Sequence, residues 1–375
     1  MEIQDLVNID PEEQRKKKRN KIIIIIIITI LSISNIIFII LYINSRKKTE
    51  TEKEKEEEKY TPLPSWNDGD SKNNITEYIK QISKENIPKE DRIAVFDLDG
   101  TLFQETDLVY DDWKLYYYRV YNDSNYNATN KQKQIADLID QAGKNGSMPE
   151  DLNIEIAETY MELFTNMTLE EYDKYIKDFI NKPSEGYDNL KRGDAFYKPM
   201  LELIEYLQRN DFNIYITSGT DRFQVRSVIE GHIKIPKSNI IGSDYLVKTN
   251  NQGNIKGNEY EYNKSDSFIF NGTFLNKNLK TNKIIGIIKE IGKQPLLAFG
   301  NSGGDGSMAN YVINNNKYSS LSFMVLCDDI VRERGDIEKA NKMRKNCEDN
   351  GWIPISMKDD WKTIYGDNVK KKEVK

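Results

Sequence analysis

The sequence predicts an α/β protein built on a doubly wound parallel sheet, and three observations lead to this prediction. Short apolar runs alternate with segments of helical periodicity from Ile75 onward. A polar cluster directly follows three of these runs, as "DLDGT", "TSGT" and "GNSGGD". An uncharged stretch, "IIIIIIITILSISNIIFIILYIN", precedes all of them. We therefore expect a single transmembrane helix followed by an α/β body.

The uncharged stretch lies within residues 21–44 and is long enough to cross a bilayer. A hydrocarbon core of ~30 Å requires about 20 apolar residues in a helix. A secretory signal has a shorter apolar region and a small-residue cleavage site, and neither feature is present. A buried helix of a soluble protein is a poor alternative, because the run has no polar face. We predict that residues 21–44 insert into a membrane and that residues 1–20 form a basic tail.

The charges beside this span leave its orientation open. Lysine and arginine determine orientation, whereas acidic residues count little. They are balanced on the two sides, although "RKKKRNK" on the N-terminal side is the tighter cluster. N-glycosylation sequons begin at Asn74, Asn122, Asn127, Asn145, Asn166, Asn263 and Asn271. Together these features favour a signal-anchor with the body outside the cytosol, either lumenal or extracellular.

The segment "KKTETEKEKEEEK" separates the span from the body. Its mixed charge and lack of apolar residues predict a disordered, solvated linker over residues 45–60. The folded body is expected to begin near Thr61. At the other end of the chain, residues 367–375 form a basic tail.

The body reads as alternating helices and strands. Helices are predicted by their period at residues 75–85, 198–211, 282–292 and 335–351, and strands begin at residues 93, 212, 295 and 321. Such alternation is typical of a Rossmann-like sheet with helices on both faces. Ligands bind beyond the carboxyl ends of the strands in these sheets, which is where the polar clusters lie. The core is predicted over residues 61–103 and 197–366.

The segment between the first two strands is too long for a loop. Four stretches within it are amphipathic: "DDWKLYYYRVY", "NKQKQIADLIDQAG", "LNIEIAETYMELF" and "LEEYDKYIKDFI". We therefore predict an inserted helical cap over residues 104–196.

The stretch "IAVFDLDGTLF" contains the most informative pair of residues. Asp97 and Asp99 are two positions apart, with one residue between them, at the end of an apolar strand, so alternation predicts that they point the same way. Neighbouring carboxylates raise each other's pKa unless a cation or a proton lies between them. The pair therefore predicts a bound cation.

Four motifs in this order resemble the signatures of haloacid-dehalogenase-like hydrolases: "DLDGT", "TSG", a lysine at the start of a later helix, and "GNSGGD". The likeness is closer to a phosphoserine-phosphatase-like branch, which shares "LPSWND", "YKPMLEL" and the "GW…MKDDWK" ending. The resemblance covers about Leu63 to Gly366. It implies a Mg²⁺-dependent phosphatase that hydrolyses a small phosphomonoester through an aspartyl-phosphate.

The resemblance also implies roles for individual residues. Asp97 would attack phosphorus, and Asp99 would protonate the leaving alcohol and then activate water. Thr101 would steady the loop between them. Ser218 would bind a phosphoryl oxygen together with the backbone near Gly219, and Lys283 would hold the nucleophile and the phosphoryl group. The implied Mg²⁺ ligands are Asp97, the backbone carbonyl of Asp99, Asn301 and Asp305.

Two departures leave alternatives open. Many members of the family have Asp where this chain has Asn301, and Cys327 stands where the branch commonly has His. A catalytically silent binding or adaptor protein is one alternative, and a phosphotransferase is another. The second acid, Asp99, argues against dehalogenation.

Composition excludes other classes. The formal net charge of −6 gives no reason to expect nucleic acid as a partner. The chain has one histidine, His232, so mechanisms that need two are excluded. Cys327 and Cys347 cannot form a zinc site by themselves, and whether they pair stays open. The substrate and the oligomeric state are not determined by the sequence.

Overall fold

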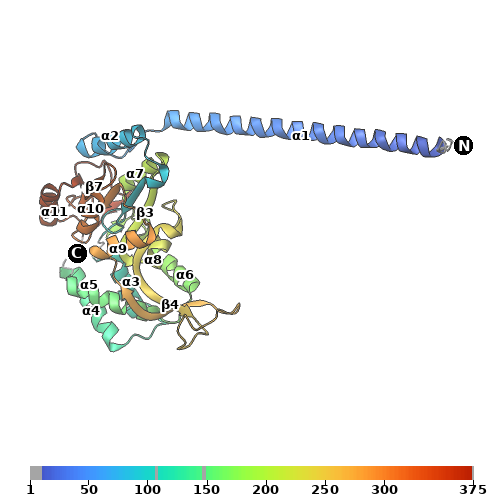
Figure 1. Ribbon diagram of the computed structural model, residues 1–375. Helices are drawn as coiled ribbons and strands as arrows, with labels where there is room; N and C mark the ends of the chain where they lie inside the picture. Colours follow the sequence, from blue (N-terminus) through green and yellow to red (C-terminus); the bar gives the residue numbers. More distant parts are fainter. Residues whose placement is uncertain (1–10, 106–108, 146–148, 374–375) are drawn as a thin grey trace. The chain divides into compact units, whose positions relative to one another are not determined.

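The computed structural model describes residues 11–105, 109–145 and 149–373, and the chain divides into two compact units. The first unit is Met1–Thr61, and the second, which we call the body, is Pro62–Lys375 (Figure 1). The body thus begins beside the predicted start at Thr61. Residues 1–10 of the predicted N-terminal tail and residues 374–375 of the predicted C-terminal tail lie outside the described residues.

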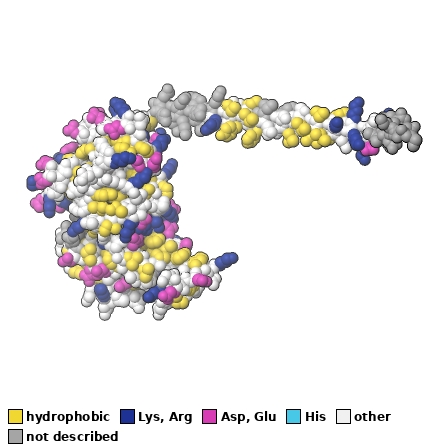
Figure 2. All heavy atoms as spheres, in the orientation of Figure 1, with side chains coloured by type: hydrophobic (Ala, Val, Ile, Leu, Met, Phe, Trp, Pro, Cys, Tyr) yellow, Lys and Arg dark blue, Asp and Glu magenta, His cyan; other side chains and the backbone are white. Residues whose placement is uncertain are grey.

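One helix, α1 (Pro11–Lys59), runs through most of the first unit. Its Glu12–Arg46 portion is long and apolar enough to cross a membrane by length and composition. Figure 2 shows hydrophobic side chains along this portion, with lysine and arginine near both of its ends. The segment predicted as a charged, disordered linker, residues 45–60, continues the helix to Lys59. Glu and Lys have high helix propensity and pair favourably at a spacing of four residues, which the sequence prediction underweighted.

The body is built on a seven-stranded sheet with the order β5-β4-β3-β1-β6-β7-β8. Its strands are β1 (Ile93–Phe96), β3 (Asn213–Asp221), β4 (Ile240–Thr249), β5 (Phe268–Asn276), β6 (Leu297–Gly300), β7 (Leu321–Leu326) and β8 (Ile353–Ser356). Strand β1 pairs in parallel with β3 on one side and β6 on the other. The strand order therefore reverses at β1, and the predicted doubly wound sheet is confirmed.

One edge of the sheet differs from the prediction. Strand β5 pairs antiparallel with β4, so the sheet is parallel only from β4 to β8. Strands β4, β5 and β8 were absent from the prediction. The two edge strands β5 and β8 carry several half-buried or exposed positions, so they lack the continuous apolar run of a central parallel strand.

Helices of the core flank this sheet. They are α2 (Asp70–Lys84), α7 (Lys198–Arg209), α8 (Arg222–Val228), α9 (Thr281–Glu290), α10 (Gly306–Ile313) and α11 (Ile337–Asn350). The four helices predicted in the core correspond to α2, α7, α9 and α11. Helix α9 ends just before Gly292, whose φ of +70° is the left-handed conformation expected after a helix. Short 3₁₀ turns lie at Lys89–Asp91, Met161–Phe164, Arg192–Asp194 and Lys237–Asn239.

Four helices occupy the predicted cap segment. They are α3 (Asp111–Tyr121), α4 (Asn130–Asn145), α5 (Glu150–Tyr160) and α6 (Leu169–Ile180). Helices α5 and α6 pack against β5, beside the long β4–β5 pair in Figure 1. A short strand of the segment, β2 (Tyr187–Asp188), pairs with β9 (Lys370–Lys371). The predicted C-terminal tail is thus partly tied to the cap segment by a two-stranded sheet.

Stacked aromatic rings lie at the centre of the sheet. Phe96, Phe299 and Phe323 are cross-strand partners on β1, β6 and β7. The ring centroids of the first two are 4.4 Å apart, and those of the last two are 5.0 Å apart. All three are fully or almost fully buried. This packing fixes the register of β1 and β6, the two strands whose ends carry the "DLDGT" and "GNSGGD" motifs.

The three further motifs that the chain shares with the phosphoserine-phosphatase-like branch pack against one another. The Trp66 indole donates to the Pro199 carbonyl at 2.9 Å, and its ring packs edge-on against Trp361. The Ser65 hydroxyl donates to Glu202 at 2.6 Å. The segments "LPSWND", "YKPMLEL" and "DDWK" therefore form a packing cluster that fastens both ends of the body to α7.

Candidate active site

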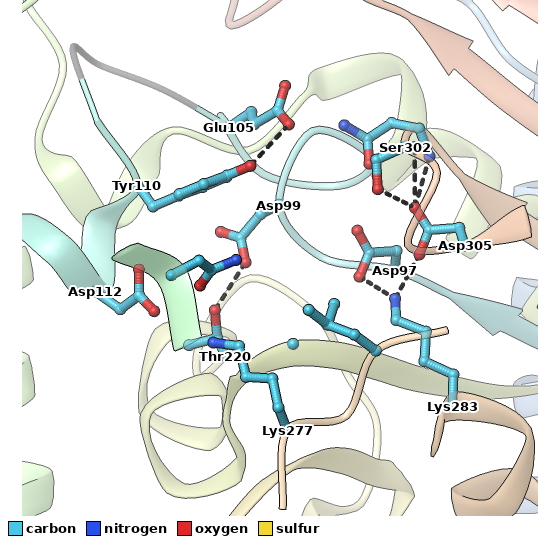
Figure 3. Close-up of a pocket in the computed structure, with 14 residues that line it drawn as sticks. Asp97, Asp99, Glu105, Tyr110, Asp112, Thr220, Lys277, Lys283, Ser302 and Asp305 are labelled. Atoms are coloured by element: carbon cyan, nitrogen blue, oxygen red, sulfur yellow. Dashed lines mark hydrogen bonds and ion pairs between the residues drawn. The ribbon is translucent and has the colours of Figure 1, made fainter. Parts of the chain in front are cut away.

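The polar clusters at the strand ends surround one pocket (Figure 3). Asp97 and Asp99 follow β1, Gly219 and Thr220 belong to the end of β3, and Asn301 and Asp305 follow β6. Lys283 reaches the same pocket from the first turn of α9. Residues that are far apart in the sequence meet here because the carboxyl ends of parallel strands lie at one edge of the sheet.

Lys283 joins two of these carboxylates. Its ammonium donates to Asp97 Oδ1 at 2.6 Å and to Asp305 Oδ1 at 2.5 Å. All three side chains are almost completely buried. Burial alone opposes a charge on Lys283, but the Asp305 and Asp97 carboxylates outweigh this effect and raise its pKa. Lys283 is therefore a fixed positive charge between two carboxylates.

Asp305 is held on its other side by the loop that follows β6. Asp305 Oδ2 accepts from the backbone N–H groups of Asn301 and Ser302 at 3.1 and 3.0 Å, and from the Ser302 hydroxyl at 3.1 Å. Burial favours the neutral acid, but the Lys283 charge and these hydrogen bonds hold the pKa of Asp305 below its usual value. Asp305 is therefore an ionised, oriented carboxylate.

Asp97 has a different electrostatic balance. Burial and the neighbouring Asp305 charge raise its pKa to about 7, and Lys283 only partly opposes them. A further positive charge near Asp97 favours its ionised, nucleophilic form.

Asp99 lies in the same pocket but has another partner. Its Oδ2 accepts from the Thr220 hydroxyl at 2.9 Å. Burial, followed by the charges of Asp97 and Asp112, raises the pKa of Asp99 well above its usual value, whereas the Thr220 hydrogen bond lowers it. The cation predicted at the Asp97 and Asp99 pair stays a prediction; in this structure the Lys283 ammonium joins Asp97 to Asp305. Strand β1 ends at Phe96, so strand alternation no longer applies to these two residues.

A glycine turn brings the Asn301 amide against the "DLDGT" loop. Gly100 has a φ of +78°, and a Cβ atom there would lie 1.9 Å from Asn301 Nδ2. The Oδ1 atom of Asn301 is buried and has no hydrogen-bond partner among the described residues. An amide oxygen of this kind is a suitable ligand for a hard cation such as Mg²⁺.

The residues present fit a divalent cation. The Asp97 and Asp305 carboxylates are close enough to contact one ammonium, and the free Asn301 oxygen lies in the same pocket. Within the described residues no group of three or more His, Cys, Asp or Glu side chains is arranged to hold a metal. A metal here would therefore depend on two carboxylates together with amide, backbone and water oxygens, which is the ligand set that the resemblance implies.

Two predicted residues do not line the pocket. Ser218 is fully buried, and its hydroxyl accepts from the Thr220 N–H at 3.0 Å. Thr101 is also fully buried, and its hydroxyl has no partner among the described residues. Ser218 therefore lies behind Gly219 and Thr220, and its contact with a phosphoryl oxygen stays a prediction.

Several pocket residues were absent from the sequence prediction. They are Thr220, Lys277, Asp112, Tyr110 and Glu105. Thr220 directly follows the "TSG" motif, so its position next to that motif could have predicted that it lines the pocket. The others come from the cap segment and from the loop between β5 and α9, whose position over the strand ends depends on tertiary packing.

The two cysteines do not pair. Both are free thiols: Cys347 is buried in α11, and Cys327 is half-buried. Cys327 follows β7 and donates to the Asp336 carbonyl at 3.6 Å. Burial raises its pKa, and the nearby Lys339 charge opposes that effect.

No family model and no curated protein sequence matches the chain. Similar solved structures include a protein of unknown function from Anaerococcus prevotii, with 14% identity, TM-score 0.46 and coverage of 75% of this chain and 90% of that chain. Cytosolic 5′-nucleotidase IIIB bound to cytidine has 14% identity, TM-score 0.45 and coverage of 76% and 83%, respectively.

A phosphoserine phosphohydrolase-like protein from Francisella tularensis is also similar, with 16% identity, TM-score 0.35 and coverage of 67% of this chain and 92% of that chain. Hydrolases described as members of the haloacid-dehalogenase family occur among the matches as well.

Proposed function

We propose that this chain is a membrane-anchored, Mg²⁺-dependent phosphatase of the haloacid-dehalogenase superfamily that hydrolyses a small phosphomonoester. The observation that carries the proposal is the contact of one lysine, Lys283, with both Asp97 and Asp305 at the strand ends. A carboxylate attacks a phosphate ester only where positive charge offsets the charge of the ester. This pocket supplies the Lys283 charge beside Asp97 and oxygen ligands for a cation.

In the first step, an Asp97 carboxylate oxygen bonds to phosphorus while the bond from phosphorus to the ester oxygen breaks. Asp99 donates its proton to the departing oxygen, which leaves as an alcohol. The raised pKa of Asp99 favours the protonated acid that this step needs. The products of this step are a phosphorylated Asp97 and an ionised Asp99.

In the second step, Asp99 takes a proton from water, and the water oxygen bonds to phosphorus. The bond between phosphorus and Asp97 breaks, which releases phosphate and restores both side chains. Thr220 orients Asp99 through its hydrogen bond in both steps. Lys283 keeps Asp97 in place and offsets the charge that develops on the phosphoryl oxygens.

Asp97, Asp305, Asn301 and the backbone carbonyl of Asp99 would hold the Mg²⁺. Bound there, the ion would neutralise phosphoryl charge as a Lewis acid. The chain's own contribution is to fix Asp305 through three hydrogen bonds and to leave the Asn301 amide oxygen free for a ligand role.

The size of the pocket supports a small substrate. Its cavity volume is about 70 Å³. Residues from the cap segment, among them Tyr110 and Asp112, form part of its wall. Phosphorylated metabolites therefore fit better than phosphoproteins.

The membrane anchor is supported by the length and apolar composition of the Glu12–Arg46 portion of α1. The proposed orientation, with the body outside the cytosol, rests on the charge cluster before the span and on the sequons. Protease protection in sealed vesicles tests it: protection of the body from externally added protease in vesicles with the lumen inside is expected, and digestion contradicts it.

The activity is tested with the full-length chain purified in detergent. Release of phosphate from p-nitrophenyl phosphate and from a panel of small phosphomonoesters is expected in Mg²⁺, and chelation should abolish it. Tight binding of phosphate without turnover on any substrate contradicts the proposal and favours a silent binding protein. Transfer of phosphate to added alcohols in place of water favours a phosphotransferase.

A further inference from the structure

The pocket has two chemically distinct halves. Asp97, Lys283, Asp305 and Asn301 form the half in which the phosphoryl group is handled. On the other side of Asp99 lie Thr220, Asp112 and Lys277 (Figure 3). Asp99 gives its proton to the departing oxygen in the proposed reaction. The second half is therefore the place of the leaving group.

The lysines at this site differ in whether their ammonium group already forms an ion pair with a carboxylate. Lys283 contacts Asp97 and Asp305. Lys339, beside the pocket, lies 2.7 Å from both carboxylate oxygens of Glu105. Lys277 has no carboxylate within 4.0 Å of its ammonium, and its side chain donates no hydrogen bond, within the part of the chain that is described. Lys277 is thus the lysine of this set whose charge is available to a ligand.

The position of Lys277 is fixed by its backbone and by its neighbour. Its carbonyl accepts from the Leu279 N–H at 3.0 Å and from the Asn282 side chain at 2.9 Å. The next residue, Asn278, is buried and donates to Thr217 Oγ1 and to the Ser218 carbonyl, both at 3.0 Å. These hydrogen bonds hold the backbone at Lys277 in place. Figure 3 shows the Lys277 side chain extending toward Thr220.

Burial makes an unmatched ammonium costly. It lowers the pKa of Lys277, and the charges of Asp112, Asp99 and Asp221 only partly oppose this effect. Among these three carboxylates, Asp112 has the largest effect on the pKa of Lys277. One of the Asp112 carboxylate oxygens accepts a hydrogen bond from the Trp113 N–H at 2.9 Å. A half-buried cation of this kind is stabilised when a ligand brings an anion into contact with it.

We propose that Lys277 binds an anionic group on the leaving half of the substrate, so that the preferred substrates are phosphomonoesters whose alcohol carries a carboxylate or a second phosphate. This inference rests on the proposed function and specifies its substrate class. Lys277 acts as a specificity residue, since it lies on the leaving-group side of Asp99 and away from Asp97. The selectivity arises because the contact exists only when the alcohol is itself charged.

The test compares matched substrates with the full-length enzyme. 3-Phosphoglycerate and glycerol 3-phosphate have the same three-carbon skeleton and differ in a carboxylate. Fructose 1,6-bisphosphate and fructose 6-phosphate differ in a second phosphate. The wild-type chain is expected to favour the charged member of at least one pair in kcat/KM, and the pair that is favoured identifies the anion.

Variants of Lys277 then assign the preference. Lys277→Met is expected to reduce the ratio of kcat/KM values for the charged and uncharged members about tenfold or more, because a hydrogen bond to a charged group is lost. Lys277→Arg should restore part of the ratio. Lys289→Met, which removes an exposed lysine of α9, is the matched control and should leave the ratio unchanged.

Asp112 provides the rival explanation and its test. If Lys277 only balances the charges of Asp112 and Asp99, Lys277→Met lowers kcat/KM equally for both members of each pair. Adding Asp112→Asn to that variant then recovers the lost activity. That outcome overturns the inference, as does a wild-type enzyme with no preference within either pair. Hydrolysis of p-nitrophenyl phosphate by the wild-type chain separates these results from failure of the proposed function, in which no ester is hydrolysed.

Discussion

The ammonium of Lys283 lies 2.6 Å from Asp97 Oδ1, and both groups are buried at the carboxyl end of β1. The lysine and the aspartate are 186 positions apart in the sequence. Their contact depends on the placement of α9 against the sheet. The same ammonium also contacts Asp305, so one side chain lowers the pKa of two carboxyl groups.

Replacing this lysine should damage both folding and chemistry. Lys283→Met leaves Asp97 and Asp305 buried without a counter-ion, which costs about 3–5 kcal/mol in the free energy of unfolding. Urea unfolding measures this loss, and phosphate release measures the loss of activity. Lys289→Met serves as the exposed control on the same helix and should retain both properties. A Lys283→Met variant with wild-type stability contradicts the ion-pair assignment.

Thr220 should tune the pH range of the enzyme. Its hydroxyl donates to Asp99 and stabilises the ionised form, so it lowers the pKa of Asp99. Thr220→Val removes the donor at nearly constant volume and therefore raises that pKa. Because Asp99 must carry a proton to act as the acid, the alkaline limb of kcat/KM should move to higher pH.

The pH profile of kcat/KM measures this shift. Thr273→Val, at an exposed position of β5, is the matched control and should leave the profile unchanged. A shift of the Thr220→Val limb to lower pH is incompatible with Asp99 as the general acid.

Asp221 should make stability depend on pH. Burial raises its pKa to about 6, while hydrogen bonds from the Gln224 N–H and the Tyr172 hydroxyl oppose that rise. The folded state therefore holds the Asp221 proton more tightly than the unfolded state. This contribution to stability is complete below the ordinary Asp pKa and is lost as the pH rises through about 6.

Asp221→Asn removes the ionisable group and keeps an oxygen to cap α8. We expect the variant to gain melting temperature relative to wild type at pH 8 and to gain little at pH 4. Thermal unfolding across this range provides the measurement. An equal change at both pH values means that the effect is one of packing and not of charge.

Gly100 should tolerate no side chain. Alanine there meets two obstacles, the positive φ of +78° and the Asn301 amide. Gly253 has a positive φ of +57°, but a Cβ atom added there would have no other atom within 4 Å, so Gly253→Ala isolates the backbone cost. That cost is about 1–2 kcal/mol. Gly100→Ala should lose more stability than this and should also lose activity, and equal losses in the two variants contradict the close approach of Asn301.

Much of the fold was predictable from the sequence because its elements have strong periodic signals. Strand β1 is apolar at every position and buried at every position. Helix α7 buries Met200, Leu203, Ile204 and Leu207, which are spaced by three and four residues. Such patterns arise from packing of one face against a sheet, so they are visible without tertiary information.

The rest of the fold lacked such signals. Strand β5 is exposed or half-buried at most positions, and its pairing partner is set by the hairpin it forms with β4. The charged segment before the body has no apolar face, yet its residues favour a helix. Composition therefore predicted disorder where local propensity and continuity with the preceding helix produce a helical segment.

The candidate site was predictable where a motif sits on a strand end. Asp97, Asp99, Asn301 and Asp305 all reach the pocket for this reason. Lys277 was missed because it lies in the loop between β5 and α9, where nothing in the local sequence indicates which way it faces. Ser218 was expected in the pocket but is buried behind it, since its orientation depends on a single turn of backbone.

The most direct test of the central claim is to identify the residue that carries the phosphoryl group during turnover. The enzyme is mixed with a phosphomonoester, quenched in acid, reduced with borohydride to trap any acyl-phosphate, and digested for mass spectrometry. The mechanism predicts modification of Asp97 in the wild-type chain and none in the Asp97→Asn variant, which should also release no phosphate. Modification of another residue, or full turnover by Asp97→Asn, would contradict it.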